Sequence, residues 1–161
     1  MEEKVIKLVD HYKMEQHPEG GWYKEVYRST DIIKNKNLEN RNILTSIYFL
    51  LTDKNCSKFH SIQSDELWYY HSGSGFTVHC LSPKGLYYTL KIGPNFLKGE
   101  VFQALVPKGT IFGSTVEEKD GYSLVGCAVA PGFDFSDFRL HSADELLQKF
   151  PNDHHIIKRL T

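Results

Sequence analysis

Short apolar segments separated by turn residues make up most of the chain. Residues 22–28 alternate between aromatic or aliphatic and charged side chains, which is typical of a strand with one buried face. From residue 43 onward, further strand patterns follow at short intervals, at 43–51, 66–70, 76–81, 86–92, 101–106, 122–130 and 133–140. Turns rich in glycine, proline and serine separate them. Many short strands joined by such turns predict an all-β sandwich or barrel.

Helical periodicity is found near the two ends of the chain. Apolar residues recur at helical spacing within residues 2–14, and a proline and two glycines at 18–21 end that pattern. Near the other end, Ser142 and Glu145 form a capping box, which predicts a second short helix. Residues 30–41 are polar and rich in Asn and Lys without a sustained period, so we expect an exposed loop there.

Length and composition limit the class of protein. The 161 residues predict one domain, 1–161, and the formal net charge of −1 offers no basic patch for nucleic acid. The three cysteines, Cys56, Cys80 and Cys127, lack C-x-x-C spacing, so we expect neither a disulfide framework nor a zinc knuckle. The first residues lack the apolar segment of a signal peptide, and no apolar run approaches the ~20 residues of a membrane span. We therefore expect a cytoplasmic protein without a nucleic-acid or membrane partner.

The segment from Ser57 to Gly73 carries the most informative spacing. His60, a glutamate six residues later at Glu66, and a glycine seven residues after that resemble the first cupin motif. Residues 106–112, built around a Pro-x-Gly turn, resemble the second cupin motif. In cupins these two segments place the ligands of one metal ion inside the barrel, typically three histidines and a glutamate.

The sequence departs from that ligand set. The second histidine of the first motif falls at Ile62, and the histidine of the second motif falls at Phe112. His60 and Glu66 are the motif ligands that remain, and two protein ligands are fewer than the three expected of a catalytic metal site. We therefore expect no cofactor, and no tightly held divalent metal at His60 and Glu66 unless Gln103 or another neighbour contributes.

A narrower resemblance extends over nearly the whole chain. Matching strings occur in order at 17–23, 59–60, 64–68, 106–109, 123–127 and 130–135. Together they are similar to the cupin subfamily once catalogued as a domain of unknown function, DUF985. The resemblance implies a double-stranded β-barrel, or jelly roll, with short N- and C-terminal helices, and a homodimer. It implies no established reaction.

Strand alternation suggests which side chains share the barrel interior. If Glu66 points inward, Trp68 and Tyr70 follow it. If the next strand forms a tight hairpin at Gly73, His79 lies opposite Trp68 and joins the same cavity. A longer or bulged turn would instead send His79 outside. Gln103 is polar within an apolar strand and faces either the cavity or solvent.

Three functions fit these residues. The first is binding of a small polar ligand, such as a carbohydrate, by Trp68, Tyr70, His79 and Gln103 beside His60 and Glu66. The second is a metal-free epimerase or isomerase, in which a hydrogen bond from the His60 ring to the Glu66 carboxylate orients His60 as the catalytic base. The third is a structural or storage protein without chemistry.

Two further expectations concern the N-terminal third of the chain. His17 and Glu19 lie in a turn before the first strand, where they either build the turn or cover the barrel mouth. The aromatic strand that begins at Trp22 would form a homodimer contact if it lies at a sheet edge.

Overall fold

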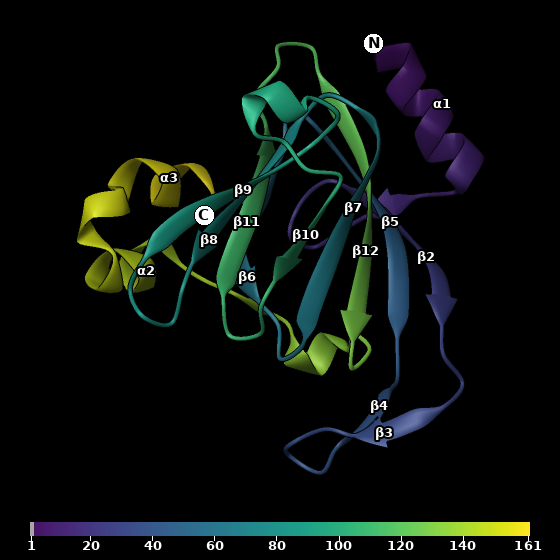
Figure 1. Ribbon diagram of the computed structural model, residues 1–161, viewed down its shortest axis with the longest axis vertical. Helices are drawn as coiled ribbons and strands as arrows, with labels where there is room; N and C mark the ends of the chain where they lie inside the picture. The colour runs from purple at the N-terminus through teal and green to yellow at the C-terminus, as the bar shows by residue number, and fades with distance from the viewer. Residues whose placement is uncertain (1) are drawn as a thin grey trace.

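Two antiparallel sheets face each other and enclose the core (Figure 1). The computed structural model describes residues 2–161. The first sheet contains, in order, β1 (Glu15–Gln16), β2 (Trp22–Arg28), β5 (Thr45–Thr52), β12 (Tyr122–Ala130), β7 (Asp65–Gly73) and β10 (Gln103–Val106). The second contains β13 (Arg139–Leu140), β6 (Cys56–Ser61), β11 (Ile111–Val116), β8 (Phe76–Leu81) and β9 (Tyr87–Ile92). The predicted mostly-β architecture is confirmed.

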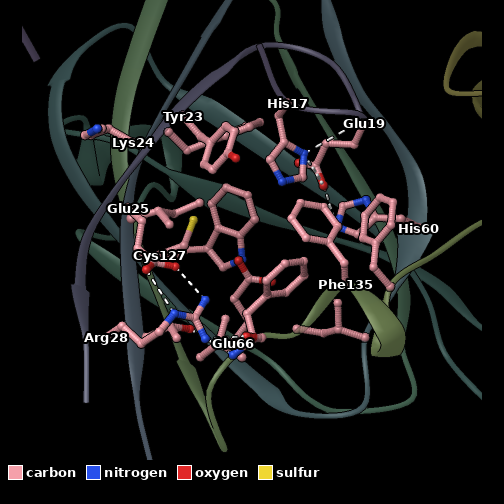
Figure 2. A pocket seen from close by; sticks show the side chains of 18 of the residues that line it. His17, Glu19, Tyr23, Lys24, Glu25, Arg28, His60, Glu66, Cys127 and Phe135 are labelled. Atoms are coloured by element: carbon pink, nitrogen blue, oxygen red, sulfur yellow. Dashed lines mark hydrogen bonds and ion pairs between the residues drawn. The ribbon is translucent and has the colours of Figure 1, made fainter. Parts of the chain in front are cut away.

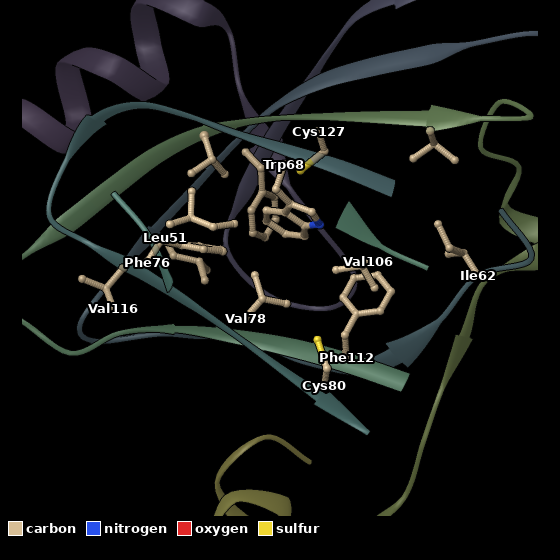
Figure 3. Packing of buried hydrophobic residues seen from close by; sticks show 14 residues of the cluster. Leu51, Ile62, Trp68, Phe76, Val78, Cys80, Val106, Phe112, Val116 and Cys127 are labelled. Atoms are coloured by element: carbon tan, nitrogen blue, oxygen red, sulfur yellow. The ribbon is translucent and has the colours of Figure 1, made fainter. Parts of the chain in front are cut away.

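Large apolar side chains fill the space between the sheets (Figure 3). Trp68 from the first sheet meets Phe76 and Phe112 from the second, and each is about 1% exposed. The alternation of side chains along each strand explains which residues form this core, because every second residue of a strand points to the same face. On β8 the inward residues are Phe76, Val78 and Cys80. At one end of this core, Ile62 and Trp68 also form part of a cavity wall.

Helices cover the outer faces of both sheets (Figure 1). Helix α1 (Glu2–Tyr12) packs Val5 onto Leu50 and Leu124 of the first sheet. Helices α2 (Ala143–Lys149) and α3 (His154–Arg159) lie on the opposite flank of the molecule. The predicted cap of α2 is confirmed, since Ser142 Oγ accepts a hydrogen bond of 3.3 Å from the Glu145 backbone N–H. No helix within residues 2–161 is long and apolar enough to cross a membrane.

Two segments differ from the sequence expectation. The expected loop at 30–41 contains a two-stranded hairpin, β3 (Ile32–Lys34) with β4 (Asn40–Asn42), which projects from the barrel in Figure 1. Arg41 anchors it through two hydrogen bonds to Asp137, of 2.7 and 2.8 Å. The expected strand at 133–140 is interrupted by a 3₁₀ turn, η2 (Phe135–Asp137), because the Asp134 side chain accepts hydrogen bonds from Ser136. Only its end, β13 (Arg139–Leu140), is a strand.

The predicted hairpin between the strands at 66–70 and 76–81 is wrong. Strand β7 pairs with β12 and β10 in the first sheet, whereas β8 pairs with β11 and β9 in the second. Gly73, with φ of 99°, and the residues after it carry the chain from one sheet to the other. Strands adjacent in sequence therefore face each other across the core instead of sharing a ladder.

The loop before β2 is folded onto the second sheet. Gly20 and Gly21 have φ values of 112° and 76°, a region that side-chain-bearing residues rarely adopt. A Cβ at Gly20 would collide with the Cys56 carbonyl oxygen, so the loop backbone lies directly against β6. The Lys58 N–H donates a 2.8 Å hydrogen bond to the Glu19 carbonyl oxygen. This docking carries the Glu19 side chain into the barrel.

The edge of β2 is only partly covered. Strand β1 pairs with Trp22 and Tyr23, and among residues 2–161 the rest of β2 has a neighbouring strand on one side only, β5. Val26 and Tyr27 are about half exposed there. The homodimer stays a prediction, for which light scattering of the free protein is the direct measurement.

Candidate functional site

A cavity of about 290 Å³ opens at one end of the barrel (Figure 2). Aromatic side chains form much of its wall: Tyr23, Phe49, Trp68, Phe133, Phe135 and Phe138. Two charged pairs stand on opposite sides of it in Figure 2, Arg28 with Glu25 and His60 with Glu19. The cavity therefore combines apolar ring faces with a small number of fixed polar groups.

His60 forms an ion pair with Glu19. Its Nε2 lies 3.0 Å from Glu19 Oε2, and the two side chains are 4% and 7% exposed. Ser57 Oγ donates a 2.8 Å hydrogen bond to the other Glu19 oxygen. The His60 Nδ1–H donates to the Lys58 carbonyl oxygen at 2.7 Å. The predicted hydrogen bond between His60 and Glu66 is wrong, because Glu19 occupies the ring nitrogen that it would have used.

Electrostatics hold this pair in its charged form. Burial alone would lower the pKa of His60, but the Glu19 carboxylate and its hydrogen bond raise that pKa above its usual value. Burial would likewise raise the pKa of Glu19, and the charge of His60 lowers it below the usual range. An imidazolium carries a proton on each nitrogen, and both protons are engaged. His60 thus has no free nitrogen with which to act as a base.

The pKa of Glu66 is shifted in the opposite direction from that of Glu19. Burial raises its pKa to about 7, an effect that His60 reduces and Glu19 increases. The Cys127 thiol lowers the pKa of Glu66 slightly, and burial raises the pKa of that thiol. A carboxyl group with a pKa near neutrality can both give and take a proton under ordinary conditions. Of the two predicted catalytic residues, Glu66 is therefore the one suited to acid–base chemistry.

Trp68 is the predicted ligand-binding residue that does line the cavity. It points to the same side of β7 as Glu66, as strand alternation predicts. Its indole nitrogen is buried and has no hydrogen-bond partner among the described residues. The cross-strand neighbour of Trp68 on β12 is Cys127, which also faces the cavity.

The other three predicted ligand-binding residues lie away from this cavity. Tyr70 packs against the core and donates a 2.7 Å hydrogen bond to the Gly73 carbonyl oxygen. Gln103 is exposed on the edge strand β10. His79 is buried, but on the opposite face of β8 from Val78 and Cys80. We expected His79 opposite Trp68 because we expected β7 and β8 to pair as a hairpin. The two strands do not pair, so this reason for placing His79 in the cavity does not hold.

His79 belongs to a separate cluster outside the barrel interior. Its two ring nitrogens are hydrogen-bonded to the Tyr87 hydroxyl at 2.8 Å and to Thr115 Oγ1 at 2.9 Å. Burial lowers the pKa of His79 to about 4, so the ring is neutral near pH 7. The Tyr87 ring stacks on it with a centroid distance of 6.1 Å. These contacts hold β8, β9 and β11 together and leave His79 no role in the cavity.

Glu19 is the site residue that the sequence did not single out. Its position in a proline- and glycine-rich turn suggested turn construction or a cover for the barrel mouth. In the structure it lies inside the cavity wall beside His17, whose Nδ1 is 3.4 Å from the same carboxylate oxygen. Burial lowers the pKa of His17, an effect that Glu19 partly offsets. No local pattern in the sequence predicts that Glu19 is buried, because its burial depends on the packing of this loop against β6.

The residues present do not fit the metal that cupin motifs imply. Ile62 is an apolar part of the cavity wall, and the Phe112 ring lies 4.2 Å from the ring of His60, centroid to centroid. Both nitrogens of His60 are already engaged. Within residues 2–161, no group of three or more His, Cys, Asp or Glu residues is arranged to hold a metal ion.

Comparison with known proteins identifies the family. The sequence pattern of the Cupin superfamily (DUF985) matches residues 6–141. The chain belongs to the DUF985 family of cupins. It is 34% identical over 155 residues to the uncharacterized protein YML079W of Saccharomyces cerevisiae, a match that spans 87% of this chain and 77% of the yeast protein.

Solved structures agree with this assignment to the DUF985 cupins. A hypothetical protein from Leishmania major matches with a TM-score of 0.91 and 35% identity, over 97% of each chain. Protein SO0799 from Shewanella oneidensis matches with a TM-score of 0.89 and 41% identity, over 96% of this chain and 95% of its own. Oxalate decarboxylase from Bacillus subtilis matches at 16% identity, with a TM-score of 0.56, over 91% of this chain and 36% of its own. That last likeness shows the barrel fold alone.

The buried ion pair predicts a large effect of Glu19→Gln. The substitution leaves the His60 imidazolium buried without its counter-charge, so the free energy of unfolding at pH 6 should fall by about 3–5 kcal/mol. The pKa of His60 should also drop, because burial then dominates. Urea denaturation and an NMR titration of the His60 ring measure the two effects.

The matched control is Glu117→Gln, which breaks an ion pair with Arg159 of similar geometry at the surface. The two side chains there are separated by 2.8 Å and are about half exposed. A pair in that setting contributes about 1 kcal/mol or less. Equal losses for the two variants would contradict a buried, charged His60–Glu19 pair.

The raised pKa of Glu66 predicts a pH-dependent gain from Glu66→Gln. Between pH 4.5 and about 7 the folded protein binds more protons at Glu66 than the unfolded chain does, so this residue makes stability fall as pH rises. Glutamine removes that dependence. The variant should exceed the parent in unfolding free energy by about 3 kcal/mol at most at pH 8.5, and by little at pH 5.

Urea denaturation at the two pH values measures this difference. Glu15→Gln is the control, since Glu15 lies at the exposed rim of the same cavity. A gain that is the same at pH 5 and pH 8.5 would show that Glu66 is not a buried carboxyl with a raised pKa.

Proposed function

We propose that this protein binds a small polar molecule inside the barrel. The observation that carries the proposal is a cavity of about 290 Å³ between the side chains at one end of the packed core. A volume of that size has room for roughly ten water molecules. It lies at the small end of the range for metabolite-sized ligands.

The cavity wall favours a flat or ring-shaped ligand with polar edges. Tyr23, Phe133 and Phe135 contribute aromatic rings to the wall, and Phe135 is about half exposed. Aromatic faces of this kind stack against sugar rings and other planar groups. Glu66 and the indole nitrogen of Trp68 supply polar contacts deeper inside. This composition fits a carbohydrate-like or similarly sized polar ligand.

The same cavity argues against a purely structural or storage role. Burial of Glu66 raises its pKa to about 7, and the indole nitrogen of Trp68 has no hydrogen-bond partner in the described part of the chain. Each of these features costs stability. A barrel without a ligand would be more stable with apolar side chains at these positions, so their presence supports a binding role.

Thermal shifts of the full-length protein test the proposal. The compounds are a panel of monosaccharides, sugar lactones and nucleotide sugars. Those that raise the melting temperature should lose most of the effect in Glu66→Gln and in Phe135→Ala, since both side chains line the cavity. Phe96→Ala is the control, because Phe96 is 77% exposed and lies outside the cavity wall. Unchanged shifts in both cavity variants would refute binding at this site.

A second candidate is an epimerase or isomerase that works without a metal. The pKa of Glu66, raised to about 7 by burial, favours it because proton transfer is most efficient when the catalytic pKa lies near the working pH. In this version Glu66 exchanges the proton next to a substrate carbonyl. His60, fixed by Glu19 and Lys58, supplies positive charge to the cavity and is not the base.

Solvent exchange tests the second candidate. Deuterium from the solvent should enter keto sugars of the panel next to the carbonyl, and the rate should fall at least about 100-fold in Glu66→Gln. Glu15→Gln, at the cavity rim, should retain the parental rate. No incorporation above background across the panel would argue for binding without catalysis.

A further inference from the structure

We infer that the ligand of this cavity presents an uncharged carbonyl oxygen to the indole N–H of Trp68. The inference rests on the proposed binding function and specifies the chemical class of its ligand. It starts from a polar atom that the protein itself leaves unsatisfied.

The indole nitrogen of Trp68 is a buried donor without an acceptor. The residue is 1% exposed, and no hydrogen-bond partner of Nε1 exists among residues 2–161. A buried N–H group is satisfied in the great majority of folded proteins, because leaving it unpaired costs stability. An unpaired donor in a cavity wall therefore indicates that something else supplies the acceptor.

The ring cannot turn to find a partner within the protein. It packs between Phe49, at 5.9 Å between ring centroids, and Phe76, at 5.2 Å, with Phe112 at 6.3 Å. In Figure 3 the nitrogen edge of the indole points away from Phe76 and toward the end of the barrel where Ile62 lies. Ile62 belongs to the cavity wall, so the buried donor is directed toward the cavity.

The surrounding wall favours an uncharged acceptor. Ile62 and Val129 are apolar, and the carboxyl groups of Glu19 and Glu66 face the same space. These carboxyl groups disfavour an anion beside the indole. Of the cationic side chains of the wall, His60 is already paired with Glu19, and Lys24 and Arg28 lie on the side of the cavity opposite His60 in Figure 2.

A carbonyl oxygen meets these requirements. It is uncharged, and it accepts a hydrogen bond in the plane of its substituents. A planar carbonyl group also fits between the aromatic faces that make up much of the wall. The ligand class is therefore a small ring compound whose ring, or the group attached to it, carries a ketone, ester or amide oxygen.

Indole NMR signals provide the direct test. The chain has two tryptophans, Trp22 and Trp68, so a ¹⁵N-labelled sample gives two indole N–H signals, and Trp22→Phe identifies the one from Trp68. The probes are acetophenone, α-methylstyrene, which has the same shape with a methylene group in place of the carbonyl oxygen, and benzoate, which is anionic. Acetophenone should move the Trp68 signal downfield in a saturable way.

The expected affinities separate the probes. Acetophenone should bind about tenfold more tightly than α-methylstyrene, and also more tightly than benzoate. Trp68→Phe keeps an aromatic ring but removes the donor, so it should abolish the preference for the carbonyl compound. Trp22→Phe should leave that preference intact.

Failure of the inference can be told apart from failure of the binding proposal. Equal binding of acetophenone and α-methylstyrene, with shifts of the Ile62 and Val129 methyl signals but none of the Trp68 indole, would overturn the inference alone. Tighter binding of benzoate would also overturn it. If no probe moves the methyl signals of Ile62 or Val129, the inference is overturned. If, in addition, no compound of the sugar panel raises the melting temperature, the binding proposal is overturned as well.

Discussion

The buried ion pair between His60 and Glu19 is the interaction on which the site depends. It joins a loop that leads into the first sheet to strand β6 of the second, so it connects the two halves of the barrel at the cavity. Buried charges are tolerated only with close geometry and further hydrogen bonds. Here Ser57 and the Lys58 backbone complete the arrangement, and Gly20 lets the loop approach β6 closely enough, while Gly21 lies against β5.

This pair also divides the acid–base roles within the cavity. Glu19 receives the positive charge of His60 at 3.0 Å, which lowers its pKa. Glu66 lacks such a partner, and burial raises its pKa to about 7. The pKa values of the two carboxyl groups in this cavity are therefore shifted in opposite directions, down for Glu19 and up for Glu66. Proteins commonly place an acid and a base in one site in this way. The group free to exchange a proton is the one that the ion pair leaves out.

Local pattern predicted the strands better than their partners. The bounds of β2 and β12 follow from alternation and apolar runs, and the cap at Ser142 follows from its own side chain. The pairing of β7 does not, because the residues at 73–75 resemble a hairpin turn, whereas the chain crosses there to the other sheet. The prediction that Trp68 points inward is correct despite this error, because it depends only on alternation within β7. The prediction for His79 is wrong, because it depended on which strand pairs with β8.

Two apolar substitutions explain how a cupin barrel of this kind can hold its cavity without the usual metal ligands. Phe112 stands where the second motif places a histidine, and its ring packs on His60 while Phe138 lies on the same imidazole at 5.3 Å. These rings exclude water from the ion pair, which strengthens the attraction between His60 and Glu19. A protonated histidine thereby supplies positive charge where the family motif would supply a cation. Glu19 balances the imidazolium charge, and Glu66, which has no such counter-charge among the described residues, would be available to the ligand that we propose for this cavity.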